Sequence, residues 1–151
     1  MEITEWKNGD YIVSTDKSKI DLQEVHQFLS HSYWAENIPK EIVQKSIENS
    51  LCFGIYHLDR QIGFARVISD FATFAYLADV FILPHERGRG LSKWLMQTII
   101  EHPKLQGLRR FTLATRDAHE LYAQYGFTTF DKPDRWMQRH DPDVYKKNPE
   151  Q

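Results

Sequence analysis

One segment near the middle of the chain constrains the possible folds more than any other part of the sequence. An apolar run rich in aromatic and β-branched residues covers residues 73–83 and stops at Pro84, which cannot continue a central strand. The glycine-rich sequence Arg87-Gly88-Arg89-Gly90 follows, and helical spacing begins directly after it. The inward-facing positions of that spacing are Leu91, Trp94, Leu95, Thr98 and Ile99. The sequence therefore predicts a strand that passes through a tight turn into an amphipathic helix.

The turn between this strand and helix has the composition of an anion site. The first N–H groups of a helix have no partner within the helix, and the helix dipole places positive charge at the same end. Gly88 and Gly90 allow a ligand to approach the backbone closely. Arg87 and Arg89 add positive charge, and Ser92 adds a hydroxyl donor. We expect this turn to bind phosphate.

Two familiar phosphate-binding motifs do not fit this turn. The P-loop pattern needs Gly-Lys followed by Ser or Thr, and that combination occurs nowhere in the chain. The dinucleotide pattern GxGxxG fails at its third glycine, where Lys93 stands after Gly88 and Gly90. Neither a P-loop protein nor a dinucleotide-binding fingerprint is therefore supported.

The rest of the chain alternates short strand-like and helix-like patterns. Further strands are expected at residues 11–14, 52–57, 62–69, 110–115, 127–130 and 135–139, and the last two are expected to form a closing hairpin. Helices are expected after a capping-box sequence at Ser18, after Pro39 and after a second capping box at Asp117. The order β-α-α-β-β-β-α-β-α-β-β predicts an α/β protein of the α+β type, with a mixed sheet that contains at least one parallel pair.

Length and composition bound the class of protein. The chain has 151 residues, which suits one domain, expected over residues 1–140 and followed by a loose tail over residues 141–151. Cys52 is the only cysteine, so an intrachain disulfide and a cysteine-based zinc site are excluded. The seven histidines show no metal-ligand spacing, and no apolar run approaches the roughly 18 residues of a membrane span. We expect no metal site, no membrane partner and a cytoplasmic setting.

Charge is unevenly distributed along the chain. The net charge is −2, but residues 84–116 carry seven basic and two acidic side chains, whereas residues 1–83 carry seven basic and twelve acidic ones. A small basic region in an acidic protein argues against nucleic-acid binding, which needs a broad basic face. It fits a compact polyanion such as a nucleotide phosphate. The acidic first half hints at a cationic acceptor, such as a polyamine-like molecule.

The strand–turn–helix segment resembles the cofactor motif of the GNAT superfamily of N-acetyltransferases. That motif reads Arg or Gln, two residues, Gly, one residue, and then Gly or Ala. Here it is Arg87-Gly88-Arg89-Gly90-Leu91-Ser92, with a serine in the last small position. The sequence Leu121-Tyr122-Ala123-Gln124-Tyr125-Gly126-Phe127 is similar to the family's Tyr-x-x-x-Gly-Phe helix end. Together the two motifs extend the resemblance over residues 11–140.

The resemblance implies a twisted mixed sheet of about seven strands, splayed at its centre to form a cleft for acetyl-CoA and flanked by about four helices. The backbone of Val80, Phe81 and Ile82 would pair with the pantetheine arm of acetyl-CoA. The turn of Arg87, Gly88, Arg89, Gly90, Leu91 and Ser92 would hold the pyrophosphate. Tyr122 would protonate the departing CoA thiolate while a neutral amine attacks the thioester directly.

The group that accepts the amine proton is less well defined. Asp79 is the only carboxylate on the central strand, although strand alternation places it on the opposite face from Val80 unless a bulge resets the phase. His119 and ordered water are alternatives. Tyr33 and Trp34 lie in the expected loop between the first two helices, which borders the acceptor site in this family. They either line that site or only anchor the loop.

Two functions from different classes fit these features. The first is transfer of an acetyl group from acetyl-CoA to a primary amine, preferably that of a small molecule, with a peptide or protein amine as the competing acceptor. The second is a CoA-binding module that senses or regulates without turnover. Tyr122 in the matching position argues against the second function. A homodimer is expected by family habit alone.

Overall fold

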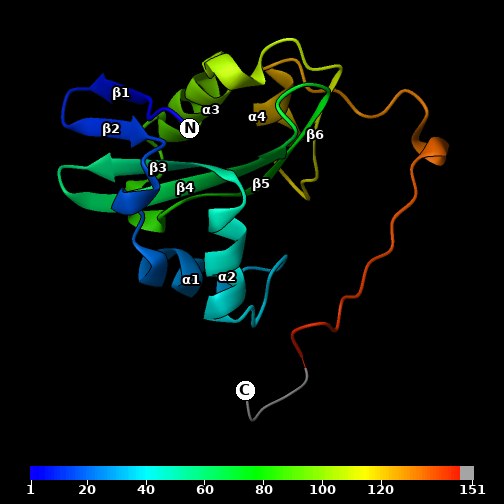
Figure 1. Ribbon diagram of the computed structural model, residues 1–151, viewed down its shortest axis with the longest axis horizontal. Coiled ribbons are helices and arrows are strands. Elements are labelled where there is room, and N and C mark those ends of the chain that lie inside the picture. The colour runs from blue at the N-terminus through cyan, green and yellow to red at the C-terminus, as the bar shows by residue number, and fades with distance from the viewer. Residues whose placement is uncertain (147–151) are drawn as a thin grey trace.

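The computed structural model describes residues 1–146 and is built on one six-stranded sheet, shown in Figure 1. The strands lie in chain order: β1 (Glu5–Asn8), β2 (Tyr11–Ser14), β3 (Leu51–His57), β4 (Arg60–Ser69), β5 (Phe74–Ile82) and β6 (Arg110–Leu113). Neighbouring strands are antiparallel except β5 and β6, which are parallel. The expected mixed sheet is therefore confirmed, with six strands in place of about seven.

Four α-helices cover the two faces of the sheet (Figure 1). They are α1 (Leu22–Ser30), α2 (Lys40–Glu48), α3 (Leu91–Glu101) and α4 (His119–Ala123). Leu95 and Ile99 of α3 pack into one core with Phe53 of the sheet, and Val25 of α1 and Val43 of α2 pack into a second core on the other face. Burial of these apolar side chains is the main force that holds helices and sheet together.

The N-terminal boundaries of two helices differ from those expected. Helix α1 begins after Asp21, whose carboxylate accepts from the backbone N–H of Glu24 at 3.1 Å, and the expected cap Ser18 lies in a preceding 3-10 turn. Helix α4 has no side-chain cap from Asp117. The hydroxyl of Thr115 accepts from the backbone N–H of Ala118 instead, at 3.0 Å. Both capping-box predictions were wrong: Asp21, nearer to the start of α1 than Ser18, caps that helix, and α4 has no side-chain cap.

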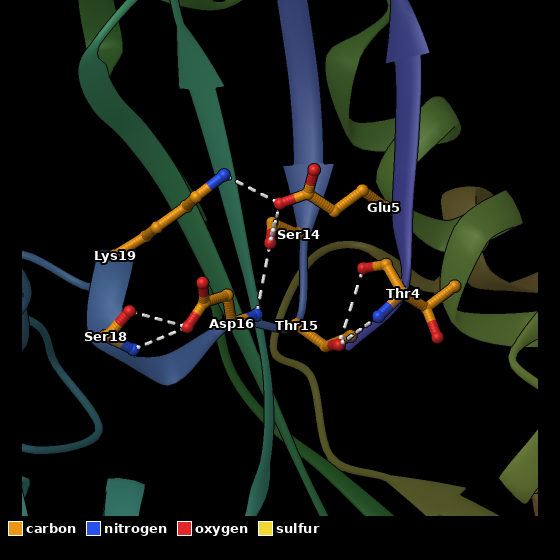
Figure 2. A network of polar contacts seen from close by, with 7 residues as sticks. All are labelled: Thr4, Glu5, Ser14, Thr15, Asp16, Ser18 and Lys19. Atoms are coloured by element: carbon orange, nitrogen blue, oxygen red, sulfur yellow. Dashed lines mark hydrogen bonds and ion pairs between the residues drawn. The ribbon is translucent and has the colours of Figure 1, made fainter. Parts of the chain in front are cut away.

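Strand β1 was not expected from the sequence, and a polar network joins it to the rest of the chain. Glu5 accepts a hydrogen bond from the hydroxyl of Ser14 in β2 and forms an ion pair with Lys19, both at 2.7 Å (Figure 2). These contacts hold the pKa of the Glu5 carboxyl below its usual range, because Lys19 and Ser14 favour the charged form. The network fixes the first hairpin against the turn that leads into α1.

A β-bulge interrupts β5 near its end. Phe81 pairs with Phe64 of β4, but the next pair is Ala78 with Arg66, so two residues of β5 oppose one residue of β4. The extra residue is accommodated at Asp79, whose φ of 57° is in the left-handed region. The bulge resets the alternation, and Val80 packs on the same core as Leu77. The bulge that the sequence analysis named as a condition for Asp79 is therefore present, and Val80 does not share a face with Tyr76 as uninterrupted alternation would require.

The C-terminal hairpin expected at residues 127–130 and 135–139 does not form. Within the described part of the chain these segments pair with no strand, and a short 3-10 turn (Pro133–Arg135) lies between them. Phe130 and Trp136 stack on each other at 4.2 Å, and the segment runs away from the sheet in Figure 1. Of the expected tail over residues 141–151, residues 147–151 lie outside the described residues. No helix within residues 1–146 is long and apolar enough to cross a membrane.

Candidate active site

The sheet opens between β5 and β6, the last two strands in its order. The two strands pair only over Phe74–Leu77 and Arg110–Leu113, although β5 continues to Ile82. Within the described residues, the edge of residues 78–82 that faces β6 therefore has no strand partner. The resemblance implied a splay at the centre of the sheet, and the structure has one between its last two strands. It leaves the free edge of residues 78–82 open to an extended ligand, apart from the Ile82 carbonyl, which accepts from Arg87, because an unpaired strand edge can accept one more strand-like partner.

The bulge places the carboxylate of Asp79 beside the loop between α1 and α2. Its Oδ1 accepts from the indole N–H of Trp34 at 2.9 Å, and its Oδ2 pairs with the guanidinium of Arg66 at 2.9 Å. Arg66 also donates to the hydroxyl of Ser50 at 3.0 Å. The side chains of Asp79 and Arg66 are only 10% and 15% exposed, so the ion pair is largely shielded from water. The structure thus brings two of the expected site residues, Asp79 and Trp34, into contact.

A cavity of about 580 Å³, named here the aromatic pocket, lies next to this contact. Its walls are Glu24, Gln27, Phe28, His31, Ser32, Tyr33, Trp34, Leu83 and Arg116. Tyr33 and Trp34 meet edge to face at 5.1 Å, and both side chains are exposed. The guanidinium of Arg116 lies over the ring of Tyr33 at 3.9 Å. The expected pair of aromatic residues therefore does line a pocket, and Arg116 joins it from the chain segment between β6 and α4.

Tyr122 is the buried member of the expected site. It lies in α4 with 9% of its surface exposed, and its ring meets Phe127 edge to face at 6.1 Å. Burial raises the pKa of the Tyr122 hydroxyl, with smaller contributions from Tyr33 and Asp117. Its hydroxyl has no hydrogen-bond partner among residues 1–146. Tyr122 is thus a protonated donor that is not committed to another group.

The turn that precedes α3 forms a second cavity of about 320 Å³, named here the loop pocket. Its walls are Ile82, Glu86, Arg87, Gly88, Gly90, Leu91, Ser92, Lys93 and Leu121. Gly88 and Gly90 have φ values of 82° and 77°, a conformation that costs other residues roughly 1–2 kcal/mol each. This backbone turns the first N–H groups of α3 toward the cavity mouth, where an anion would be stabilised by the helix end.

The two arginines of the turn are held in different ways. Arg87 lines the loop pocket, and its Nε donates to the backbone carbonyl of Ile82 at 3.0 Å. Arg89 does not line this pocket. Its guanidinium instead contacts Glu86 at 3.2 Å and the hydroxyl of Tyr11 at 3.0 Å. Of the two arginines, Arg87 is thus the one whose side chain borders the loop pocket.

Helix α4 borders the loop pocket. Leu121 lines that pocket, and the next residue, Tyr122, lines neither cavity but is near enough to Tyr33 of the aromatic pocket for Tyr33 to contribute to its raised pKa. A ligand that extends from the loop pocket along the free edge of β5 would therefore bring its end to Tyr122. A second ligand in the aromatic pocket would approach the same place from the opposite side. This arrangement suits a reaction between two bound molecules.

Several residues of the site could not be found from the sequence, and others play only structural roles. Phe28, His31 and Arg116 carry no motif, because a pocket built from three distant segments has no local pattern. Cys52 is fully buried, and burial raises the pKa of its thiol to about 12, so it is no nucleophile at neutral pH. His119, an alternative proton acceptor, lines neither cavity. No cluster of metal-binding side chains is found within residues 1–146.

Comparison with known proteins identifies the fold. The model of the acetyltransferase (GNAT) family matches residues 19–127, which contain both cavities and all the site residues described above. The chain belongs to the GNAT acetyltransferase family. A Gibberella zeae protein named as an inferred acetyltransferase is 33% identical over 142 residues, with 79% of each chain covered.

Solved structures agree with this membership. A GNAT family protein from Xanthomonas campestris pv. campestris is 55% identical, with a TM-score of 0.89 over 91% of this GNAT chain and 97% of its own. A Clostridium acetobutylicum protein solved with acetyl-CoA shares 15% identity and a TM-score of 0.66, with 92% and 96% coverage. At that identity the likeness is one of fold.

Proposed function

We propose that this protein transfers an acetyl group from acetyl-CoA to the primary amine of a small molecule, with Tyr122 as the general acid. The observation that carries the proposal is the position of Tyr122. Its hydroxyl is unpaired, and its largely buried side chain follows Leu121 of the loop pocket and lies near Tyr33 of the aromatic pocket. A pure binding module has no use for an uncommitted proton donor at that place.

The residues of the loop pocket and of β5 fit the parts of acetyl-CoA. The turn from Arg87 to Ser92 offers backbone N–H groups and a guanidinium to the pyrophosphate. The free edge of residues 78–82 offers amide partners to the pantetheine arm, which contains two amide groups of its own. The same edge can direct an N–H group at the thioester carbonyl and stabilise the negative charge that develops on its oxygen.

The chemistry is the attack of an amine on a thioester. Acetyl-CoA supplies an activated acetyl group, whose carbon–sulfur bond breaks as a bond forms between the amine nitrogen and the carbonyl carbon. Tyr122 donates its hydroxyl proton to the sulfur, so the thiol leaves in neutral form. One amine proton must pass to a base, and the balance closes when that base later returns a proton to Tyr122 through solvent.

Asp79 is the base that this arrangement favours. The bulge turns its carboxylate to the aromatic pocket side, where Trp34 contacts it. Each of its two oxygens already accepts one hydrogen bond, whereas an ionised carboxylate can accept about four in all. The remaining sites can take the amine proton, directly or through a water molecule.

The aromatic pocket favours a small acceptor over a peptide or a protein. Its volume of about 580 Å³ lies within the roughly 300–1,000 Å³ typical of small-molecule sites. Turnover with a small-amine panel, compared with a panel of peptides at equal concentrations, separates the two acceptor classes. Activity with peptides alone would reverse the choice of a small acceptor.

We also propose a cytoplasmic setting, which suits a chain whose single cysteine, Cys52, is a buried thiol.

The Tyr122→Phe variant tests the proposal against a binding module. We expect turnover to fall by about 10²–10⁴-fold, the usual loss for one acid–base group. Acetyl-CoA should still stabilise the variant by about 2.7 kcal/mol at roughly 100 times its Kd. Tyr125→Phe is the matched control, because its hydroxyl only donates to the carbonyl of Lys93 at 2.8 Å. Wild-type protein that binds acetyl-CoA but acetylates nothing would favour the binding module.

A further inference from the structure

Arg116 occupies an unusual position for an arginine. It lies three residues after the end of β6, it is exposed, and its guanidinium lies over the ring of Tyr33 at 3.9 Å. This cation–π contact holds the charged group at the wall of the aromatic pocket. The ring face of Tyr33 is therefore already covered by a cation, so it is not free to receive a second one from a ligand.

The guanidinium of Arg116 makes no ion pair within residues 1–146. Two of the acidic groups nearby pair with other arginines. Glu24 on the pocket wall contacts Arg60 at 3.8 Å, and Asp79 beside the pocket pairs with Arg66 at 2.9 Å. Asp117, the next residue in the chain, forms no ion pair in this part of the structure and does not line the pocket. Among the side chains that line the pocket, Arg116 is therefore a cation that no described carboxylate pairs with.

We propose that Arg116 is an anion-recognition site for the acceptor, so that the acceptor is an amine that also carries a carboxylate or a phosphate. A guanidinium presents paired N–H donors that match both oxyanions. The proposal rests on the acetyltransferase function proposed above and specifies its substrate class. It also replaces the cationic acceptor that the acidic first half of the sequence suggested, because the charge that matters is that of the pocket wall.

The pocket geometry gives the rest of the acceptor a place as well. With its anion at Arg116, the molecule can rest against the aromatic side chains of Trp34 and Phe28, which line the same cavity. Its amine is then directed to Asp79, which Trp34 contacts, and to the thioester beside Tyr122. Recognition at one end and reaction at the other would fix the orientation of the amine.

The test compares matched amines with and without an oxyanion. Phenylalanine against phenethylamine measures the effect of a carboxylate, and phosphoethanolamine against ethanolamine measures that of a phosphate. For wild-type protein we expect kcat/KM to favour the oxyanion member of at least one pair by about 10- to 100-fold, as for a charge-assisted hydrogen bond. The pair with the larger ratio identifies the oxyanion.

Two variants, each of which removes one positive charge, test whether the preference for an oxyanion depends on Arg116. Arg116→Gln should reduce the ratio within each pair to near one. Arg110→Gln is the matched control, since that guanidinium lies over Trp136 at 5.0 Å and lines neither cavity. It should keep the wild-type ratio. An unchanged ratio in Arg116→Gln would overturn the proposal, as would equal rates within both pairs for the wild type.

A binding measurement separates this proposal from the catalytic one. Phenylalanine and phosphoethanolamine should quench the fluorescence of Trp34 in the presence of CoA, and the quenching should weaken in Arg116→Gln. Quenching without turnover would refute the acetyltransferase function while supporting the anion site. If Arg116→Gln instead loses affinity for acetyl-CoA, the arginine serves the cofactor and the anion site is refuted.

Discussion

At the residue scale, the contact between Asp79 and Arg66 combines two functions in one carboxylate. The pair is shielded from water, and it also holds the indole of Trp34 at the pocket. Removal of one partner from a buried ion pair typically costs about 3–5 kcal/mol, because the other charge is left uncompensated. A loss of activity in an Asp79 variant could therefore arise from lost chemistry or from lost structure.

Two variants separate these causes. Asp79→Asn and Arg66→Gln both break the ion pair, and we expect both to lower the free energy of unfolding by about 3–5 kcal/mol in urea titrations. Only Asp79→Asn removes the base, so its kcat should fall by about 10²–10⁴-fold in conditions where both variants are folded. Arg66→Gln should lose far less activity. Equal losses in the two variants would show that Asp79 acts only by positioning Trp34.

At the element scale, the parts of the fold that follow a simple period were the ones that the sequence predicted. Helix α3 and strands β3, β4 and β5 lie within one or two residues of their expected ranges, because α3 buries apolar residues at helical spacing and β3 and β4 are apolar runs that end at turns. Strand β1 was missed because it is short and mostly exposed. The prediction of a hairpin at residues 127–139 was wrong, because an alternating pattern alone does not supply a pairing partner.

The bulge shows why the candidate site was only partly predictable. Its existence was raised as a condition for Asp79, but no residue type marks it, since Asp79 adopts a positive φ without being glycine. The cofactor turn was predictable because its glycines and helix start are adjacent in the sequence. The aromatic pocket was not, since Phe28, Trp34 and Arg116 come together only in the folded chain.

The turn before α3 can be tested as a unit through its glycines. Gly90→Ala forces a Cβ into a backbone with φ of 77°, where no atom lies within 4 Å of it, so the strain is purely conformational. Gly107→Ala has the same open surroundings and a φ of 75°, far along the chain from the turn. Each variant should lose about 1–2 kcal/mol of stability.

The two glycine variants should differ in cofactor binding. Gly90 lines the loop pocket, so its new methyl group should obstruct the phosphate and raise the Kd for acetyl-CoA by roughly tenfold or more, equal to about 1.4 kcal/mol. Gly107→Ala should leave the Kd unchanged in calorimetric titrations. Comparable affinities for the two variants would mean that the turn does not contact the cofactor.

At the scale of the whole molecule, His102 lies where β1, β3 and the end of α3 meet. It follows α3, is 1% exposed, and packs against Phe53 of β3 at 5.7 Å and Trp6 of β1 at 6.3 Å. Its Nδ1 accepts from the backbone N–H of Lys104 at 3.1 Å, so Nε2 carries the proton, and that buried N–H has no partner within residues 1–146. The ring is thus held in its neutral form.

This predicts a loss of stability in mild acid. Burial, with a smaller contribution from Lys104, lowers the pKa of His102 in the folded state, while in the unfolded chain it returns to about 6.5. Below that pH the unfolded state binds more protons, so the free energy of unfolding falls as the pH drops, by at most about 1.4 kcal/mol per pH unit. Glu5, Asp16 and Asp70, whose pKa values are lowered, lose their stabilising effect only on further acidification, toward about pH 4 and below.

Urea titrations at several values between pH 7.5 and roughly 5 would measure this slope. His102→Asn keeps a side chain that can accept from the Lys104 N–H but cannot gain a charge, so the slope should flatten whatever the stability of the variant itself. His140→Asn is the control, because that histidine is exposed and should keep the wild-type slope. If the slope survives in His102→Asn, the acid sensitivity belongs to another group. If the slope is lost, the buried imidazole of His102 links the stability of β1, β3 and the end of α3 to pH. The physical reason is that protonation breaks the contact with the Lys104 N–H and places a charge between Phe53 and Trp6.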